Sequence, residues 1–259
     1  MKDFSMILPR TPSFRLDGKR VLVTGASRGI GLGCAVALAE LGAHLVMVAR
    51  GGDALEQAAA AVCAAGLSAE AQVLDVVDLA AVNAFFAGQA GFDVLVNSAG
   101  VARHTPALET KAEDFDTVMA VNVRAAYFLA QQAALGMQQA GRGGAIVQIS
   151  SQMAHVGGIE RAVYCGSKHA IEGINKAMAI EFGGDGIRVN SICPTFIRTP
   201  LSETTFSDPE KLQWIKSKIK LDRIGQVEDI MGAVQYLASD ASAMVTGTSL
   251  LIDGGWTAG

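Results

Sequence analysis

Two textures alternate along the chain, and together they predict alternating strands and helices. Because the first kind of run is almost continuously apolar and rich in branched residues, it is typical of strands buried on both faces of a sheet. These runs occupy residues 20–24, 44–49, 71–75, 93–97, 145–150, 186–192 and 248–253. The second kind is rich in alanine and has the periodicity of a helix. It covers residues 31–41, 54–65, 79–88 and roughly 112–138.

The alternation continues from residue 16 to residue 259 without a linker or a break in composition. This pattern predicts one doubly wound α/β domain, with a seven-stranded parallel sheet flanked by helices. Before it, residues 1–15 contain Pro9 and Pro12 and no continuous apolar run, so we expect a flexible arm rather than a signal peptide.

Residues 194–226 are the least regular part of the chain, and they carry more charges and prolines than the rest. They follow the sixth predicted strand, where a parallel sheet places its ligand crevice. We therefore expect a helical flap over a site. The alternative is a surface excursion without a functional part.

Composition narrows the functional classes. The chain has 259 residues, half of them apolar, and a formal charge of −4 without a run of like charges. These features exclude a nucleic-acid footprint and an anchor on an anionic membrane, and no apolar stretch approaches the length of a membrane span. The cysteines lack CxxC spacing, so we expect free thiols in a cytoplasmic protein, without a disulfide framework or a metal site. They are Cys34, Cys63, Cys165 and Cys193.

A glycine-rich turn, "VTGASRGIG", joins the first predicted strand to the first helix, and its glycines have the spacing TGxxxGxG. Glycines allow the backbone to turn tightly and to approach a pyrophosphate at the amino end of a helix. Since the turn follows the first of several buried strands, it predicts a dinucleotide site. The residues expected to contact the cofactor are Gly25, Ser27, Arg28, Gly29, Ile30 and Gly31.

The end of the second strand, "MVARGGD", discriminates between the two nicotinamide dinucleotides. An acidic residue there would bind the 2′-hydroxyl of NAD, whereas an arginine accommodates the 2′-phosphate of NADP. Here Arg50 is present, no carboxylate appears before Asp53, and Arg28 offers a second positive charge. We therefore expect NADP(H) to be preferred, with NAD(H) possible. The alternative is that both arginines are solvated surface charges. Asp75 and Val76, after the third predicted strand, are expected beside the adenine, unless Asp75 caps a helix.

Several further motifs follow in a fixed order: "NSAG" at 97–100, "VNV" at 121–123, a serine and YxxxK set at 151–168, "VNSICPT" at 189–195 and "IDGG" at 252–255. With the glycine turn, they make the sequence resemble the short-chain dehydrogenase/reductase family from about residue 16 onward. The resemblance implies a Rossmann-type fold and an NAD(P)-dependent enzyme that interconverts a secondary alcohol and a ketone.

Tyr164 and Lys168 are spaced to share one face of a helix, so the ammonium can lie near the phenol and favour its phenolate. Tyrosine then takes a proton from an alcohol, or gives one to a ketone, while the cofactor moves a hydride. A bare YxxxK often arises by chance. Two serines at the carboxyl end of a buried strand favour a catalytic role for this YxxxK, because open α/β sheets bind ligands at the carboxyl ends of their strands.

Ser151 precedes Tyr164 by thirteen residues, as the catalytic serine commonly does in the family. Successive side chains of a strand point in opposite directions, so we assign Ser151 to the substrate and Ser150 to packing. The family's interval varies by a residue, and Ser150 stays open as the alternative. Asn122 is the fourth catalytic residue by resemblance, which implies that it holds a water linking the lysine to solvent.

The resemblance also extends the cofactor site. Ser98 replaces the second asparagine of the family's usual NNAG, and Thr195 replaces a glycine after Pro194. The remaining positions match, and the implied cofactor contacts come from the two motifs together with the acid/base pair. They are Asn97, Ala99, Gly100, Tyr164, Lys168, Pro194, Thr195, Ile197 and Thr199.

Gln152, His155 and Arg161 lie between Ser151 and Tyr164, where we expect residues that contact the substrate. Arg161 could pair with a substrate carboxylate, although a solvated arginine is the simpler reading. These polar groups favour a sugar, polyol or sugar acid over a steroid, as in the gluconate 5-dehydrogenase-like group. A 3-oxoacyl thioester reductase and a non-catalytic dinucleotide sensor are the alternatives, but the sensor would be expected to lose Tyr164 or Lys168.

An epimerase or dehydratase is a weaker alternative, because its extra substrate domain is not evident in the sequence. The carboxyl end, "VTGTSLLIDGGWTAG", is strongly apolar for a terminus. In the family this strand commonly packs against a partner subunit, so the resemblance implies a homotetramer that acts on a small-molecule alcohol or ketone. A terminus buried in its own core is the alternative.

Overall fold

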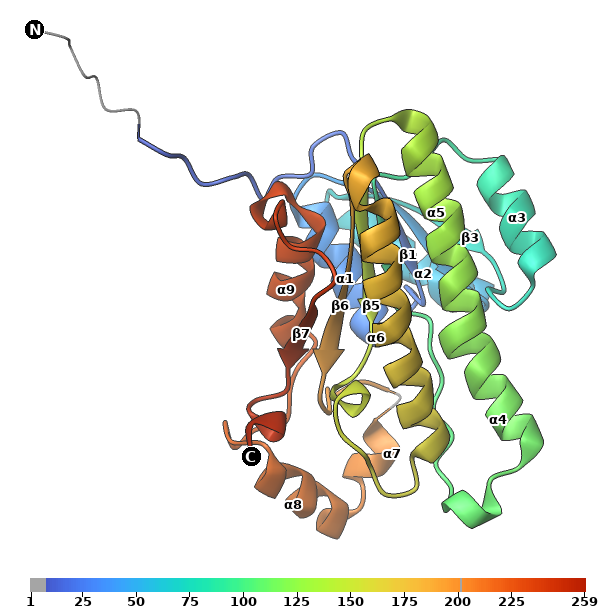
Figure 1. The fold of residues 1–259 in the computed structure, drawn as a ribbon, viewed down its shortest axis with the longest axis vertical. Coiled ribbons are helices and arrows are strands. Elements are labelled where there is room, and N and C mark those ends of the chain that lie inside the picture. Colours follow the sequence, from blue (N-terminus) through green and yellow to red (C-terminus); the bar gives the residue numbers. More distant parts are fainter. Residues whose placement is uncertain (1–7, 201) are drawn as a thin grey trace, which may run out of the picture.

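The computed structural model describes residues 8–200 and 202–259, and within them it shows a seven-stranded parallel sheet (Figure 1). The strands follow the order β3-β2-β1-β4-β5-β6-β7. Their bounds are β1 (Arg20–Thr24), β2 (His44–Ala49), β3 (Ser68–Val73), β4 (Val94–Asn97), β5 (Gly144–Ile149), β6 (Ile187–Pro194) and β7 (Ser249–Ile252). The predicted doubly wound α/β fold is confirmed.

Helices cover both faces of the sheet. One hydrophobic core joins α1, α2 and α9 to the sheet, and a second joins α3, α5 and α6 to its other face. The α-helices among the described residues are α1 (Gly29–Glu40), α2 (Gly52–Ala64), α3 (Leu79–Ala87), α4 (Ala112–Met119), α5 (Ala126–Ala140), α6 (Ala162–Phe182), α7 (Glu203–Phe206), α8 (Pro209–Lys218) and α9 (Glu228–Ala238).

The third strand was misplaced by the apolar pattern, which predicted residues 71–75. The strand instead spans Ser68–Val73 and pairs with β2 along its whole length. It is one of the two edge strands of the sheet, and most of its residues are only partly buried. A strand with one neighbour need not be continuously apolar, so hydrophobicity alone missed its start.

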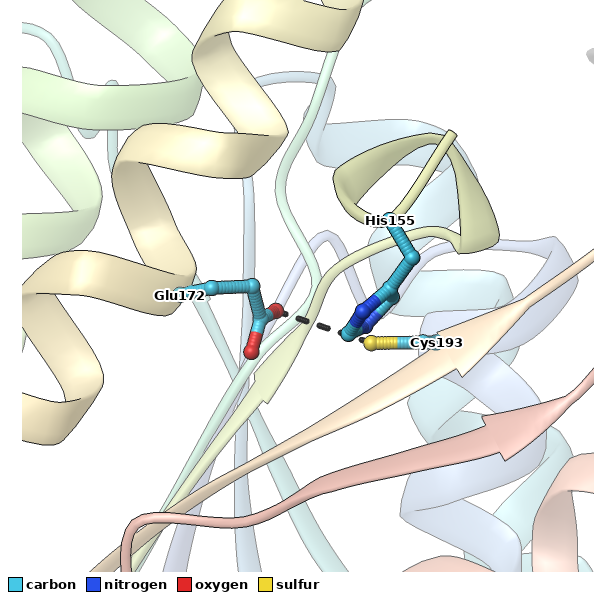
Figure 2. A group of neighbouring side chains, drawn as sticks. All are labelled: His155, Glu172 and Cys193. Carbon is cyan, nitrogen blue, oxygen red and sulfur yellow. Dashed lines mark hydrogen bonds between the residues drawn. The ribbon is translucent and has the colours of Figure 1, made fainter. Parts of the chain in front are cut away.

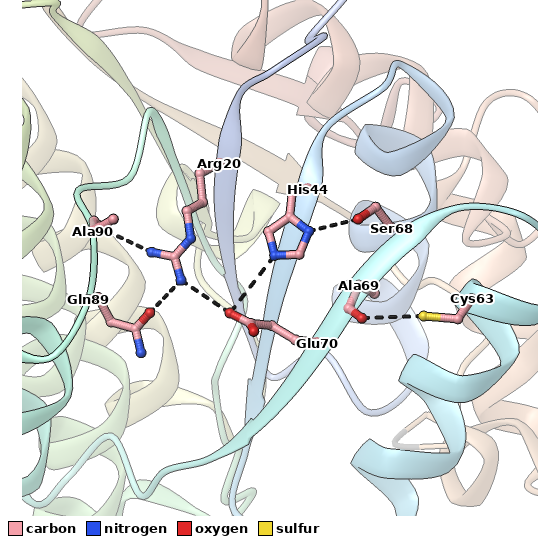
Figure 3. Close-up of polar contacts among 8 residues, drawn as sticks. All are labelled: Arg20, His44, Cys63, Ser68, Ala69, Glu70, Gln89 and Ala90. Atoms are coloured by element: carbon pink, nitrogen blue, oxygen red, sulfur yellow. Dashed lines mark hydrogen bonds and ion pairs between the residues drawn. The ribbon is translucent and has the colours of Figure 1, made fainter.

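Polar contacts tie the amino-terminal ends of β1, β2 and β3 together, at the edge opposite the predicted site (Figure 3). The Arg20 guanidinium donates to Glu70 at 3.1 Å and to the Ala90 carbonyl at 2.6 Å, and it also contacts Gln89. His44, the first residue of β2, has its ring Nδ1 2.7 Å from the hydroxyl of Ser68, the first residue of β3. These contacts hold the amino-terminal ends of the three strands together.

The long helix predicted at residues 112–138 is interrupted by one wider turn. The backbone is α-helical in α4, becomes a π-helix at Ala120–Ala125, and returns to α-helix in α5. Single π-turns inside α-helices are frequent at functional sites. Asn122 lies in this turn, so the wider turn coincides with a residue that the family resemblance implies is catalytic.

The segment 194–226 has a small hydrophobic core of its own. Phe206, Ile215, Ile219 and Ile224 are buried there and pack with Phe196, Leu212 and Trp256. Trp256 comes from the carboxyl end, and its ring centre lies 5.8 Å from that of Phe196. The segment contains α7 and α8, as expected of a helical flap, although its movement stays a prediction.

The predicted amino-terminal arm is only partly covered, because residues 1–7 lie outside the described residues. Residues 8–15 are exposed and have no helix or strand. Within the described ranges, none of the helices combines the length and apolar character needed to cross a bilayer.

Candidate functional site

A cleft of about 480 Å³ opens at the carboxyl ends of the central strands. It lies where the strand order reverses between β1 and β4, the usual ligand position in open α/β sheets. Most of the predicted cofactor residues line it. They are Gly25, Ser27, Arg28, Gly29, Ile30, Gly31, Arg50, Asp75, Val76, Ala99, Gly100, Tyr164, Lys168 and Thr199.

The glycine turn is shaped by its lack of side chains. Gly25 has a φ of +66°, and a Cβ there would lie 2.9 Å from the Ala99 backbone nitrogen. A Cβ on Gly31 would collide with the Gly25 carbonyl oxygen. No side chain caps the start of α1, and its first turn carries no acidic residue. The turn therefore presents open backbone N–H groups, a fit for the pyrophosphate of a dinucleotide.

Two arginines stand at the mouth of the cleft. Arg28 and Arg50 are exposed, and neither side chain forms a hydrogen bond or ion pair with another described residue. They are therefore free to meet a phosphate. Asp75 also lines the cleft and accepts a hydrogen bond from the Val77 backbone at 3.1 Å. Helix α3 is capped by Asp78 instead, which removes the capping alternative for Asp75.

Four predicted cofactor residues are not among those that line the cleft: Asn97, Pro194, Thr195 and Ile197. Asn97 is buried, and its side-chain oxygen accepts from the Thr24 hydroxyl at 2.8 Å. The same hydroxyl oxygen accepts from the Ala99 backbone at 3.2 Å. Asn97 thus holds the end of β4 beside the glycine turn. Ile197 is buried in the core and bridges to Gly225.

Tyr164 and Lys168 lie on one face of α6 at the inner end of the cleft, as their spacing predicted. The Lys168 Nζ is 5.7 Å from the centre of the Tyr164 ring and donates to the Ile149 carbonyl at 2.9 Å. Burial lowers the pKa of Lys168 to about 8. Burial also raises the pKa of the Tyr164 phenol, while hydrogen bonding to Ser151 and the charge of Arg161 oppose that rise.

The two serines at the end of β5 have different surroundings. Ser151 accepts from the Met153 backbone at 3.1 Å and lies beside the Tyr164 phenol. Ser150 is buried, and its hydroxyl makes no hydrogen bond of normal geometry within the described part of the chain. It lies near the thiol of Cys193. Burial raises the pKa of this thiol to about 12, and the nearby Ser150 hydroxyl opposes the rise. Among the described residues, Ser150 lines the cleft and Ser151 does not, so the assignment of Ser151 to the substrate rests on its contact with Tyr164.

Asn122 is held from two directions. Its side-chain oxygen accepts from the Val101 backbone at 2.9 Å, and its amide donates to the Val101 carbonyl at 2.9 Å and to the Ser167 hydroxyl at 3.1 Å. A Cβ on Gly100 would lie 3.5 Å from the Asn122 oxygen and 3.9 Å from the Lys168 nitrogen. The π-turn therefore places Asn122 close to Lys168, with Gly100 between the two side chains.

Arg161 is half-buried next to Tyr164, and its partner His104 was not anticipated from the sequence. The guanidinium lies 3.1 Å from His104 Nε2 and stacks 5.3 Å above the centre of the Phe196 ring. His104 in turn meets the Tyr164 ring edge to face at 6.4 Å. Among the described residues, Arg161 has no ion pair with a carboxylate. The signal available in the sequence was a histidine soon after the fourth strand.

A strained residue holds these two segments together. Glu160 has a φ of 57°, which a residue with a side chain rarely adopts. Its carbonyl accepts from the Thr105 backbone at 3.1 Å, and this bond joins the segment after β4 to the segment before α6. Backbone strain of this kind concentrates at functional sites.

The other two predicted substrate residues point elsewhere or lack partners. His155 lies next to Glu172 and Cys193 (Figure 2). One imidazole nitrogen, one carboxylate oxygen and the thiol sulfur all lie within 4.8 Å of one another. Gln152 is 1% exposed, and neither atom of its amide has a hydrogen-bond partner among the described residues. Contact of either residue with a substrate stays a prediction.

Comparison with known proteins adds independent evidence. A family model described as enoyl-(acyl carrier protein) reductase matches residues 25–257. The chain is 40% identical to D-threitol dehydrogenase of Mycolicibacterium smegmatis over 94% of this chain and 95% of that one. It is 38% identical to gluconate 5-dehydrogenase of Gluconobacter oxydans over 94% of this chain and 96% of the relative.

Among solved structures, a gluconate 5-dehydrogenase from Burkholderia cenocepacia in complex with NADP and tartrate superposes with a TM-score of 0.90. It is 34% identical and covers 95% of this chain and 98% of its own. The fold, the cleft lined by the glycine turn, the serine–tyrosine–lysine set and these relatives agree. The chain belongs to the short-chain dehydrogenase/reductase family and is an NAD(P)-dependent oxidoreductase.

Proposed function

We propose that this protein is an NADP(H)-preferring enzyme that interconverts a secondary alcohol and a ketone in a sugar, polyol or sugar acid. The observation that carries the proposal is the position of Tyr164, with Ser151 and Lys168 beside it, at the inner end of the cleft. The names of the relatives support the substrate class, because threitol and gluconate are both polyhydroxylated.

In this proposal Tyr164 is the acid/base. Bound NADP(H) supplies or accepts the hydride. The phenolate takes the hydroxyl proton during oxidation, and the phenol returns it to the ketone oxygen during reduction. Burial raises the pKa of Tyr164 and so favours the phenol, while the neighbouring hydroxyl of Ser151 favours the phenolate. The charge of Lys168 at 5.7 Å acts in the same direction as Ser151.

The preference for NADP(H) rests on Arg28 and Arg50. Both side chains are exposed at the cleft and lack partners among the described residues, so binding a 2′-phosphate breaks no existing contact. NADP in the Burkholderia cenocepacia relative is consistent with this preference.

Within the substrate class, we favour a sugar acid over a neutral polyol. Partial burial and the charge of Arg161 lower the pKa of His104 to about 4, so its ring is neutral at pH 7. The nitrogen facing Arg161 must then accept, which leaves Nδ1–H as a donor. Arg161 and His104 thus offer several N–H donors and a positive charge beside Tyr164. That set suits a carboxylate, and the tartrate of the Burkholderia cenocepacia complex is a dicarboxylate.

We also expect a homotetramer in the cytoplasm, on the family resemblance. Leu251, on the outer strand β7, is 38% exposed and is a natural part of such an interface.

The test is a panel of substrates followed at the absorbance band of the reduced nicotinamide. Gluconate and the alditol of the same chain length are compared with NADP and NAD, and their keto products with NADPH and NADH. We expect faster turnover with NADP(H) and with the acid. Cofactor binding without any turnover would favour a dinucleotide sensor, and preference for a 3-oxoacyl thioester would favour the reductase alternative.

Arg161→Gln sharpens the substrate assignment. One charge-assisted contact is worth about 1.5 to 3 kcal/mol, so kcat/KM for the acid should fall about 10- to 100-fold. The alditol should be affected by less than about threefold. Arg103→Gln is the matched control, because Arg103 already pairs with Asp114 at 3.3 Å. An equal loss for acid and alditol would contradict carboxylate recognition by Arg161 while leaving the oxidoreductase proposal intact.

A further inference from the structure

A second polar cluster lies next to the acid/base pair but belongs to no step of the proposed reaction. It joins three elements: His155 follows the short helical turn after β5, Glu172 lies on α6, and Cys193 lies near the end of β6 (Figure 2). One ligand atom from each residue lies within 4.8 Å of the other two. Glu172 and Cys193 are buried, whereas His155 is exposed, so the cluster has one side open to solvent.

The Glu172 carboxylate is already oriented. Its Oε2 accepts from the Ser191 hydroxyl at 2.7 Å and from the Ser249 hydroxyl. The other oxygen, Oε1, accepts from the Cys193 thiol at 3.5 Å. Hydroxyl groups therefore fix one oxygen and aim the other at the thiol and the imidazole. Metal-binding carboxylates are held by outer hydrogen bonds in this way.

Ser150 lines the nucleotide cleft and, next to the cluster, offers a hydroxyl that is unpartnered among the described residues. Its side chain is 4% exposed, and its hydroxyl has no hydrogen-bond partner of normal geometry in residues 8–200 and 202–259. The hydroxyl lies beside Cys193. Buried hydroxyls without a partner are rare in folded proteins, and each one needs an explanation.

We propose that His155, Glu172 and Cys193 bind a zinc ion, with a water or the Ser150 hydroxyl completing a tetrahedron. One imidazole nitrogen, one carboxylate oxygen and one thiolate form a ligand set that zinc accepts, whereas calcium and magnesium prefer oxygen alone. Bonds from zinc to ligands of this kind measure about 2.0 to 2.3 Å, so the three side chains must close by about an ångström. Because His155 is exposed, its side chain has room to make that movement.

Binding is an exchange without redox chemistry. The thiol S–H bond breaks, a bond from sulfur to zinc forms, and the proton leaves to solvent. The charged groups that face the thiol are Glu172 and Lys168 from α6. Zinc must displace the thiol proton that Glu172 Oε1 accepts, and the positive Lys168 lies nearby, so we expect micromolar rather than tight structural binding.

Zinc bound at this cluster would affect the reaction centre in two ways. Lys168 precedes Glu172 by one helical turn, so a cation on the carboxylate adds positive charge near the ammonium. His155 lies in the segment between Ser151 and Tyr164, so zinc also fixes that segment. We therefore expect zinc to slow turnover without displacing NADPH.

Direct binding of metal to the untagged protein tests the site, whether or not a substrate is known. Cadmium replaces zinc as a spectroscopic probe, because a thiolate ligand produces a charge-transfer band in the ultraviolet. The band should appear at about one cadmium per chain, be lost in Cys193→Ser and persist in Cys63→Ser, which removes the exposed thiol. Loss of the band in Cys63→Ser, or its persistence in Cys193→Ser, would overturn the site.

His155→Ala guards against a folding artefact, since the residue is exposed. Zinc affinity measured by competition with cadmium should fall by at least about 10-fold in this variant. His169→Ala is the matched control, because His169 lies near Cys165 but outside the cluster. Zinc inhibition of turnover should weaken in parallel. Equal zinc affinity in the two histidine variants would contradict the proposal.

Discussion

The two ends of the proposed site offer different kinds of groups to a ligand. At the nucleotide end, one continuous turn at residues 25–31 offers backbone N–H groups, and its shape depends on missing side chains. At the substrate end, side chains converge from separate segments: His104 after β4, Ser151 after β5 and Arg161 before α6. Backbone recognition leaves a compact motif in the sequence. Side-chain recognition leaves only scattered polar residues.

The largest expected effect among these comparisons falls on Lys168, a residue that serves both ends. Lys168→Met removes the charge that supports the phenolate, and we expect kcat to fall by about 10²- to 10⁴-fold. Because Lys168 also lines the cleft, NADPH affinity should weaken as well, unlike in variants confined to one end. Steady-state rates and fluorescence titration with NADPH measure the two effects. A kcat within a few-fold of wild type would remove Lys168 from the reaction.

Ser151→Ala acts at the substrate end alone. Loss of a preorganised donor to the substrate oxygen costs about 10²- to 10³-fold in kcat, with NADPH affinity unchanged. The serine also opposes the rise in the pKa of Tyr164, so its removal raises that pKa further. Alcohol oxidation, which needs the phenolate, should therefore move to higher pH. Ser150→Ala is the control, and a larger loss in that variant would reverse the serine assignment.

Gly31→Ala acts at the nucleotide end alone. The added methyl group collides with the Gly25 carbonyl, and overpacking of this kind costs about 1 to 3 kcal/mol, or about 5- to 150-fold in NADPH affinity. Gly173→Ala, on α6, provides the control, because a Cβ there meets nothing within 4 Å. Unchanged NADPH affinity in Gly31→Ala would show that the turn does not hold the pyrophosphate.

Arg50→Gln tests the finest distinction. We expect kcat/KM with NADPH to fall about 10-fold, the effect of losing one charged contact, and kcat/KM with NADH to change little. The ratio of acid to alditol turnover should stay the same, since Arg50 lies at the nucleotide end. A fall of equal size with both cofactors would contradict the assignment of Arg50 to the 2′-phosphate.

This difference between the two ends also explains what could be predicted from the sequence. Buried strands, the glycine turn, and the pair Tyr164 and Lys168 are local patterns, and the structure has them where the patterns place them. The outer strand β3 was misplaced because it is half-exposed. His104 was missed because its partner Arg161 is 57 residues away, in a segment joined to that of His104 by a hydrogen bond from the Thr105 backbone to the Glu160 carbonyl.

The cluster of His155, Glu172 and Cys193 shows the same limit. Its members come from three elements, so no spacing in the sequence brings them together. The sequence favoured free thiols and no metal site on the absence of CxxC pairs. The absence of CxxC pairs argues against compact zinc motifs. It does not address side chains that are distant in the sequence and are brought together by the fold.

The central claim is that Tyr164 moves the proton, while the other residues of the site bind and orient the ligands and favour the phenolate of Tyr164. Tyr164→Phe tests it most directly, with turnover of the best substrate and NADPH affinity measured on the same preparation. The account predicts a loss of about 10²- to 10⁴-fold in kcat, at every pH, with NADPH affinity within a few-fold of wild type. Turnover within 10-fold of wild type, with NADPH still bound, would contradict it.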